Sequence, residues 1–325
     1  MLYLHGMGHF NPENVISNAF LESLDIGTDE AWILERVGIR SRRTVLPLDY
    51  IRATRNADPR GAAEAALLDN AETGARAARM AMARARVSAE QIGLVLSGSC
   101  APDYAIPAEA ARIAAKLGVN APALDVASAC SSFGAQMHFL ASMRPEAVPD
   151  FVLLCQPENT TRVVDYRDRA SCVLWGDGTA AAVVSARVPA RATVDMTSMS
   201  SSPAGWDKVV VPRLGHFAQE GRAVQTFAIK TSRDLVLSIK QRAARPERLG
   251  FIGHQANLLM LDAVCRYAGI APERHFANVV DFGNTGGAGA PSVLSMRWDE
   301  LADGEEIALA VVGSGLSWAA MRIRT

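Results

Sequence analysis

The chain has 325 residues, of which 49% are hydrophobic and 21% charged, a composition typical of an ordinary soluble globular protein. This length exceeds the usual size of a single hydrophobic core, so we expect two packed halves. With 33 basic and 34 acidic residues the net charge is −1, which excludes a chain-wide attraction to nucleic acid or to an anionic membrane.

The cysteines predict neither a disulfide framework nor a metal centre. They are odd in number and widely spaced, and they contain no C-x-x-C pair, which favours a reducing compartment. The N-terminal residues lack the pattern of a signal peptide, and no apolar run reaches the ~18–20 residues of a membrane-spanning helix. We therefore expect a cytoplasmic protein with these free thiols: Cys100, Cys130, Cys155, Cys172 and Cys265.

Short apolar segments alternate with helix-like segments along the chain, which predicts an α/β layered fold. The apolar segments carry little polar alternation, as strands covered on both faces do. The predicted strands are 94–98, 123–127, 151–155 and 180–184, followed by 192–196, 249–253, 277–281 and 307–313. The predicted helices are 75–85, 107–117 with Pro107 in its first turn, and 262–268 with Gly269 as its C-cap.

The strands form two sets of four, which suggests a duplication. We predict an N-terminal half over 1–186 and a C-terminal half over 187–325, although the halves share no obvious sequence identity. The charged, Ala-rich stretch 52–70 contains Pro59-Arg60-Gly61 and is interpreted as a surface insertion, partly helical or mobile.

The first candidate for chemistry is Cys130, in the run Asp-Val-Ala-Ser-Ala-Cys. A strand is predicted to end near Ala127, and a helical pattern follows, so the cysteine lies close to a helix N-terminus. Unpaired amide donors and the helix dipole stabilise a thiolate there. The competing interpretation is a small buried hydrophobic residue, which describes most free cysteines. The other four cysteines fall inside strand or helix patterns and are interpreted as structural.

Two further segments place polar residues just after predicted strands. His254 follows the strand 249–253, at the sheet edge where α/β sites usually lie, although a lone histidine there is more often a hydrogen-bonded core residue. Asn284 lies in a Gly-rich run that permits close backbone approach but is, taken alone, more often a tight turn. The run lacks the Lys-Ser/Thr ending of a P-loop.

The combination of these segments is more specific than any one of them. Cys130 in its Ala-Ser-Ala-Cys context, His254 in His-Gln-Ala-Asn and Asn284 in Gly-Asn-Thr occur in this order. Trp-Gly-Asp-Gly-Thr at 175–179 lies between them, and Gly-Ser-Gly-Leu-Ser-Trp at 313–318 follows. From about residue 28 to the C-terminus, the chain resembles the β-ketoacyl-acyl-carrier-protein synthase III family of condensing enzymes, within the thiolase superfamily.

The resemblance implies a homodimer with the duplicated five-layer α-β-α-β-α thiolase-like fold. It implies that Cys130 is acylated, with the oxyanion held by its own N–H and that of Ser314. A malonyl thioester then loses CO₂, while His254 and Asn284 donate hydrogen bonds to the enolate oxygen. The implied substrates are acyl-coenzyme A and malonyl-acyl-carrier protein or malonyl-coenzyme A. No permanently bound cofactor is implied, and acyl carrier protein is the expected partner.

Family positions that contact coenzyme A also have counterparts here. Trp32 and Arg36 share one helix face at i, i+4 spacing, so an adenine stacked between them is reasonable, although a core Trp beside a solvated Arg would look the same. Arg169 matches another arginine near that site, and Asn257 closes the His-Gln-Ala-Asn run.

Several departures from the family concern the substrate. Leu259 stands where the family usually has an arginine that helps hold the phosphopantetheine. In the acyl pocket, Ile106 replaces an aromatic residue that caps the pocket across the dimer, and Val312 replaces a common Phe. Gly-Gly-Ala-Gly at 286–289 and the insertion 52–70 are also atypical. Together these departures predict a specialised paralogue with an unusual acyl donor or acceptor.

Other functions remain open from the sequence. Cys130 and His254 could transfer an acyl group to a hydroxyl or amine without decarboxylation, with His254 as the base. A non-catalytic partner subunit would not need all three reactive residues. A degradative thiolase would need a second catalytic cysteine in a matching context, and a plant-type polyketide synthase a different C-terminal loop. A basic cluster for acidic acyl carrier protein is one further candidate: Lys230, Arg233, Lys240 and Arg242.

Overall fold

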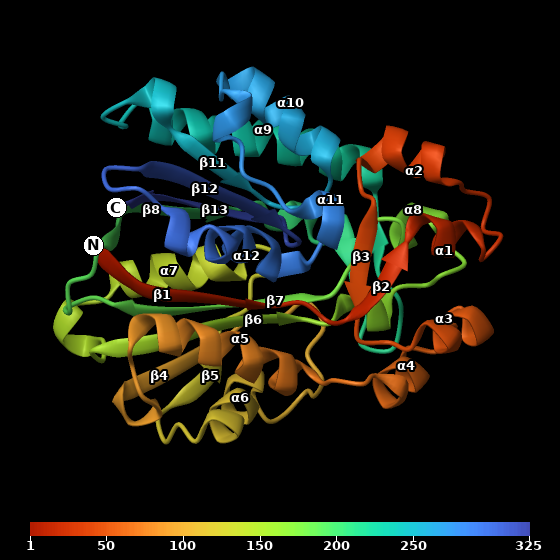
Figure 1. Cartoon of the computed structure of the whole chain (residues 1–325), viewed down its shortest axis with the longest axis horizontal. Helices are drawn as coiled ribbons and strands as arrows, with labels where there is room; N and C mark the ends of the chain where they lie inside the picture. Colours follow the sequence, from red (N-terminus) through yellow and green to blue (C-terminus); the bar gives the residue numbers. More distant parts are fainter.

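The computed structural model describes all 325 residues and is built around nine strands joined edge to edge (Figure 1). Their order is β11-β12-β13-β8-β1-β7-β6-β4-β5. Five strands come from the first half of the chain: β1 (Leu2–Phe10), β4 (Ile92–Ser97), β5 (Ala123–Asp125), β6 (Phe151–Glu158) and β7 (Gly178–Ser185). Four come from the second half: β8 (Ala192–Ser201), β11 (Gly250–Gly253), β12 (Glu306–Gly313) and β13 (Ser317–Arg324).

The two groups of strands repeat one pairing scheme. In the first group β1 pairs antiparallel with β7, β7 antiparallel with β6, and β6 parallel with β4. In the second group β8, β13, β12 and β11 follow the same sequence of pairings. The groups meet where β1 pairs antiparallel with β8 over Leu2–Leu4. This repeat supports the predicted division at residue 186, which falls between β7 and β8 and stays a prediction.

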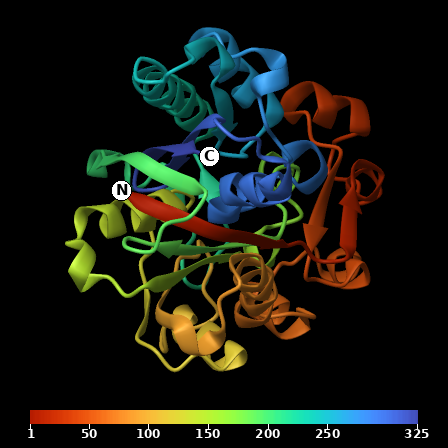
Figure 2. The same ribbon diagram turned by 60° about the vertical axis from the view of Figure 1, so that its left-hand side comes forward.

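Helices cover both groups of strands and separate them, which yields the five layers predicted for the fold (Figures 1 and 2). On one outer side lie α5 (Asn70–Ala85) and α6 (Glu109–Leu117), and on the other α9 (Gly221–Lys240) and α10 (Leu258–Ala268). The middle layer holds α7 (Ser132–Ser142) and α12 (Gly289–Met296), each in contact with strands of both groups. The predicted five-layer α/β fold is therefore confirmed.

Smaller elements extend from this body. Two short ribbons, β2 (Asn14–Ser17) with β3 (Ser41–Thr44) and β9 (Val209–Val210) with β10 (Ala218–Gln219), flank it. The predicted insertion 52–70 contains the end of α3 (Leu48–Thr54) and all of α4 (Pro59–Ala65). The remaining helices are α1 (Asn18–Glu22), α2 (Glu30–Val37), α8 (Arg169–Cys172) and α11 (Val279–Phe282).

Most predicted elements are present, but two expectations are wrong. The segment predicted as a strand over 277–281 forms the short helix α11, because the Gln255 side chain accepts the N–H groups of Asn278 and Val279 that a sheet neighbour would otherwise accept. Pro107 does not lie in the first turn of α6. That helix begins at Glu109, where the Asp125 carboxylate accepts the N–H groups of Glu109 and Ala110.

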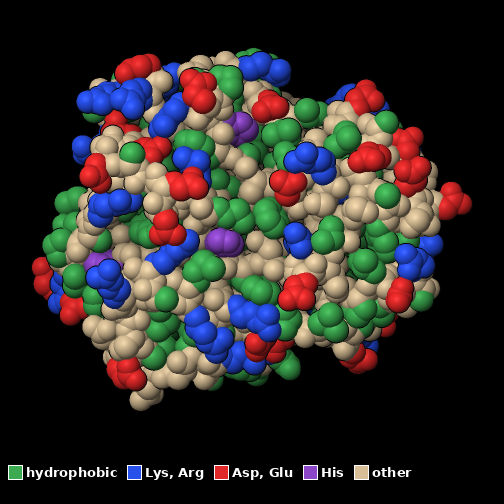
Figure 3. Space-filling view, in the orientation of Figure 1, with side chains coloured by type: hydrophobic (Ala, Val, Ile, Leu, Met, Phe, Trp, Pro, Cys, Tyr) green, Lys and Arg blue, Asp and Glu red, His purple; other side chains and the backbone are tan.

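The surface carries no large field of one charge on the face that Figure 3 shows. Basic and acidic side chains are interspersed there, in agreement with the net charge of −1. None of the helices combines the length and apolarity needed to cross a lipid bilayer.

Candidate active site

Cys130 lies in the turn that joins β5 to α7, two residues before the helix starts. Two hydrogen bonds close this turn, from the N–H of Ser131 to the carbonyl of Ser128 and from the N–H of Ser132 to the carbonyl of Ala129, both 3.0 Å. Ala129 has a φ of +46°, a left-handed conformation that costs a non-glycine residue ~1–3 kcal/mol. The backbone is thus strained directly before Cys130, as is common where a side chain must be aimed.

His254 and Asn284 come from two loops of the second half that are held together by one buried side chain. His254 directly follows β11, and Asn284 follows Gly283, whose φ of +68° suits glycine. Gln255 donates to the Gly253 carbonyl at 2.7 Å and accepts the Asn278 N–H at 3.0 Å. Because Gln255 is fully buried, these bonds fix the spacing between the two loops.

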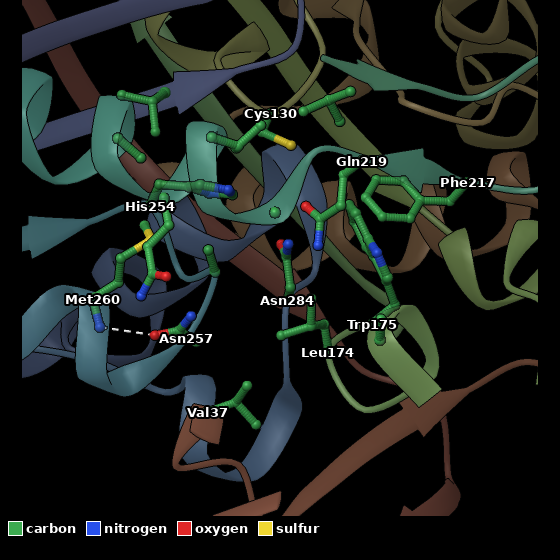
Figure 4. Close-up of a pocket in the computed structure, with 18 of the residues that line it drawn as sticks. Val37, Cys130, Leu174, Trp175, Phe217, Gln219, His254, Asn257, Met260 and Asn284 are labelled. Atoms are coloured by element: carbon green, nitrogen blue, oxygen red, sulfur yellow. Dashed lines mark hydrogen bonds between the residues drawn. The ribbon is translucent and has the colours of Figure 1, made fainter. Parts of the chain in front are cut away.

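The three residues meet at one cavity of about 290 Å³ (Figure 4). Asn284 Oδ1 accepts the N–H of Gly286 at 3.0 Å, so its NH₂ group is the part left free to bind a ligand. His254 is 7% exposed, and its Nδ1 has no hydrogen-bond partner. The structure thus brings together a thiol and two side chains that can donate to the same oxygen, although the thiol lies 124 and 154 residues before them in the chain.

The walls of this cavity are mostly apolar. Trp175 and Phe217 pack edge to face with their ring centroids 4.7 Å apart, and Val312 lies near Met260 on the opposite wall. Gln219, at the end of the short strand β10, adds a polar side chain to the lining of this cavity (Figure 4). Sequence reasoning missed Gln219, because a two-residue strand leaves no periodic pattern.

The predicted coenzyme contacts gather at the mouth of the cavity. Asp29 caps α2 by accepting the N–H of Trp32 at 2.7 Å, and this places Trp32 on the helix face that lines the opening. The guanidinium carbons of Arg36 and Arg169 lie 5.6 Å and 4.9 Å from the Trp32 ring centroid. Asn257 caps α10 through the N–H of Met260 at 2.8 Å and also lines the cavity.

Ser314 follows β12 and lines the same cavity as Cys130. Its hydroxyl donates to the Val209 carbonyl, whereas neither its backbone N–H nor that of Cys130 donates a hydrogen bond within the protein. A Cβ on the intervening Gly313 would lie 3.0 Å from the nitrogens of Cys130 and Ser131, so only glycine permits this close approach. Two free amide donors therefore lie beside the thiol.

Ile106 differs from the other predicted pocket residues. It is 84% exposed and lines neither the cavity at Cys130 nor the neighbouring cavity at Cys100. Its predicted role in the acyl pocket therefore depends on a second subunit.

Cys100 is expected from the sequence inside a strand or helix, and this placement is wrong. Cys100 lies in the loop after β4, and its Sγ is 3.9 Å from Sγ of Cys130, within hydrogen-bonding distance for two sulfurs. The sequence feature that could have pointed to Cys100 is its position three residues after a buried parallel strand, at the sheet edge where functional sites form. The other three cysteines are buried in the core: burial raises the pKa of Cys172 and of Cys265 to about 12, and that of Cys155 further.

The surroundings of the two neighbouring thiols shift their pKa values in opposite directions. The hydrogen bond from Cys100, together with nearby His254, holds the pKa of Cys130 well below the ordinary value for a thiol. The same contact, with burial and the neighbouring Glu158, raises the pKa of Cys100. Glu158 itself is fully buried, which raises its pKa to about 8. Cys130 is thus the thiol that ionises first.

A second cavity, of about 540 Å³, lies on the other side of Cys100. The loop Cys100–Ala105 forms one wall, and Pro59, Arg60 and Ala63 of α4 form another. The insertion 52–70 therefore shapes a space next to the thiol pair rather than lying apart from the site.

Comparisons with known proteins agree with this geometry. A family model described as 3-oxoacyl-[acyl-carrier-protein (ACP)] synthase III matches residues 124–203, and the model of its C-terminal part matches 246–325. The β-ketoacyl-[acyl-carrier-protein] synthase III of Sulfurovum sp. is 30% identical over 96% of this chain and 92% of its own. The crystal structure of 3-oxoacyl-[acyl-carrier-protein] synthase III from Aquifex aeolicus, 26% identical, superposes over 100% of both chains with a TM-score of 0.88. The Pseudomonas aeruginosa enzyme, 27% identical, superposes over 99% of this chain and 98% of its own with a TM-score of 0.86.

Proposed function

The chain belongs to the β-ketoacyl-[acyl-carrier-protein] synthase III family of condensing enzymes, and on this basis we propose that it joins two acyl groups through a thioester on Cys130. The observation that carries the proposal is the meeting of Cys130, His254 and Asn284 at one mostly apolar cavity. A thiol, two hydrogen-bond donors and little water are the requirements of a decarboxylative Claisen condensation.

In the first half-reaction the Cys130 thiolate attacks the carbonyl carbon of an acyl-coenzyme A. A carbon–sulfur bond forms, the carbonyl oxygen gains negative charge, and the coenzyme thiolate then leaves. The free N–H groups of Cys130 and Ser314 are the proposed donors to that oxygen. The glycine at 313 supports this assignment, because it lets the two amides approach each other.

In the second half-reaction a malonyl thioester replaces the coenzyme. The bond to its carboxylate breaks, CO₂ leaves, and the electron pair moves onto the thioester oxygen. His254 and the free NH₂ of Asn284 donate to this oxygen, and their effect is strong because the cavity is apolar. The resulting carbanion attacks the acyl carbon on Cys130, and Cys130 leaves as a thiolate.

The entrance of the cavity supports coenzyme A as the acyl carrier. Trp32 offers an aromatic face at the mouth, and the guanidinium groups of Arg36 and Arg169 lie close to it, so an adenine and its phosphates find both stacking and positive charge. Asn257 and Val312 line the path from this mouth toward Cys130. An arginine is absent at 259, where Leu259 is 40% exposed, so the malonyl carrier is held by other contacts.

Acyl carrier protein is the proposed partner for the malonyl group, as in the family. The predicted basic cluster supports its docking only weakly. Arg233 pairs with Asp234 at 2.6 Å, and Lys240 donates to the carbonyls of Ala268 and Gly269, so two of its four cations already have oxygen partners.

A homodimer is proposed because one edge of the sheet has an unpaired strand and exposed apolar side chains. β5 is the last strand in the sheet order, so it has one free edge, and its Leu124 is 45% exposed. Ile106, from the nearby loop, is 84% exposed. An exposed edge strand with apolar side chains needs a partner, and a second copy of the chain provides one by twofold symmetry.

Acyl transfer to a hydroxyl or amine is the less favoured function. Such a transfer needs a base for the acceptor but no second donor to a carbonyl oxygen. Acyl transfer of this kind gives no role to the free NH₂ group of Asn284 in the cavity at Cys130, and that group therefore favours condensation.

Intact-protein mass spectrometry tests the proposal. The protein is incubated with a panel of acyl-coenzyme A primers of different chain length, and then with malonyl-acyl-carrier protein. We expect an adduct of the primer's mass that is absent from Cys130→Ala, followed by 3-oxoacyl-carrier protein and CO₂. An adduct that persists after malonyl addition without release of CO₂ would instead support acyl transfer.

A further inference from the structure

Two thiols share the centre of this site, although the proposed reaction uses only one. Cys100 Sγ lies 3.9 Å from Cys130 Sγ and belongs to a different loop, the one that follows β4. Cys100 is partly exposed toward the second cavity, whereas Cys130 lines the first. The two cysteines of the pair therefore line different cavities.

The surroundings decide which sulfur keeps its proton. Cys130 lies just before the N-terminus of α7 and near His254, both of which favour a negative charge. Cys100 lies beside the buried carboxyl of Glu158, which accepts its backbone N–H at 2.9 Å and opposes a negative charge on its sulfur. Cys100 therefore donates the S–H···S hydrogen bond, and Cys130 accepts it.

The loop that carries Cys100 is held firmly against the catalytic turn. The Glu158 carboxyl bridges two segments, because its second oxygen accepts the N–H of Gly287, three residues after Asn284, at 2.8 Å. Within the loop the Ser99 hydroxyl accepts the N–H of Ala101 at 3.1 Å. The thiol of Cys100 is thus placed relative to both Cys130 and Asn284 before any substrate binds.

We propose that Cys100 is a further catalytic residue, whose thiol donates a hydrogen bond to Cys130 Sγ and stabilises the thiolate as nucleophile and again as leaving group. The proton stays on Cys100 in both half-reactions, so the step needs no other reactant. This inference rests on the proposed role of Cys130 in condensation.

The test follows the alkylation of Cys130 by iodoacetamide as a function of pH, with the modified peptide quantified by mass spectrometry. The titratable groups that face Cys130 are Cys100, Glu158 at the end of β6 and His254 after β11, and only the first is changed. In Cys100→Ala we expect the midpoint of the reactivity profile to rise by about one pH unit, a tenfold loss of thiolate below the midpoint. Cys100→Ser, which keeps a hydrogen-bond donor, should return the midpoint most of the way to that of the unchanged protein.

Cys265→Ala is the matched control, because this thiol is buried away from the site in α10. Its profile should equal that of the unchanged protein. Melting temperatures of all variants show whether each is folded under the assay conditions. An unchanged midpoint in folded Cys100→Ala, or a serine variant that behaves like alanine, would overturn the proposal.

The experiment separates this inference from the proposed function. Alkylation needs no acyl substrate, so the shift can appear even if the mass-spectrometric test finds no condensation. Failure of the shift, in turn, leaves the condensation result untouched.

Discussion

At the scale of single residues, the proposed roles of Cys130 as nucleophile and Asn284 as enolate donor can be tested separately. Asn284→Ala removes the free NH₂ group but leaves Cys130 and its backbone donors in place. We expect the variant to acylate itself at a nearly normal rate and to lose condensation by a factor of about 10²–10³. Separate assays of acyl-enzyme formation and CO₂ release measure the two steps, and normal condensation would exclude the role assigned to Asn284.

Glu158 predicts how the stability of the protein depends on pH. Burial raises its pKa to about 8, whereas in the unfolded chain it is about 4.3. Its contribution to stability is fully present below the unfolded value and is lost as the pH rises through about 8, because the unfolded chain then releases a proton that the folded protein retains. In Glu158→Gln this loss is absent, so the free energy of unfolding of the variant should rise relative to the parent between pH 5 and 8.

Urea unfolding at several pH values measures this difference. Asp177→Asn serves as the control, because burial raises the pKa of Asp177 only to about 6 and its effect should end near that pH. A difference between Glu158→Gln and the parent that does not change with pH would contradict the prediction.

The site residues that could be predicted from the sequence are those that lie in short, recognisable sequence motifs. Cys130, His254 and Asn284 each lie in a short distinctive segment, and the structure brings them to one cavity. Cys100 and Glu158 lie in ordinary surroundings, and their importance arises only when β4 and β6 are adjacent in the sheet. A contact between segments that are far apart in the chain leaves no local pattern.

At the scale of elements, the packing of α5 on β1 depends on two glycines. A Cβ at Gly8 would lie 2.0 Å from the carbonyl oxygen of Ala77, and one at Gly6 would lie 2.3 Å from that of Ala81. We expect Gly8→Ala to force the helix away from the sheet and to lower the free energy of unfolding by about 3 kcal/mol. Gly221→Ala, where the space around the new Cβ is empty, should cause no loss. Chemical denaturation of both variants compares them.

The same glycines explain why β1 could not be predicted. The run Leu-Tyr-Leu-His-Gly-Met-Gly-His-Phe reads as a poor strand, because glycine and histidine interrupt its apolar pattern. It nevertheless lies between β7 and β8, where helix contact rather than strand propensity selects its small residues. In contrast, β4, β6, β7 and β12 are continuous apolar runs covered on both faces, and these could be located from composition alone.

At the scale of the whole molecule, the free edge of β5 predicts the oligomeric state. We expect light scattering to report twice the chain mass of 34.7 kDa. Leu124→Glu places a charge next to its symmetry mate in the proposed interface, so this variant should dissociate. Tyr267→Glu, at a residue 64% exposed on α10, should leave the mass unchanged. A monomeric parent protein would remove the support for a role of Ile106.

From the sequence, the two strand groups could be predicted only as two sets of strands. The order of the strands in the sheet could not be predicted, because it depends on crossovers through the middle helices α7 and α12. The fold thereby brings Cys130 from one half to the same cavity as His254 and Asn284 from the other.

The adjacent thiols also decide how the protein responds to oxidants. Hydrogen peroxide converts a thiolate to a sulfenic acid, which without a partner proceeds to irreversible sulfinic acid. Cys100, 3.9 Å away, can condense with a sulfenic acid on Cys130, release water and close a disulfide that a reducing agent reopens. We expect peroxide-treated protein to recover its thiol reactivity with dithiothreitol, and Cys100→Ala to lose that recovery. Such a recovery would mean that the second sulfur protects the first from irreversible oxidation.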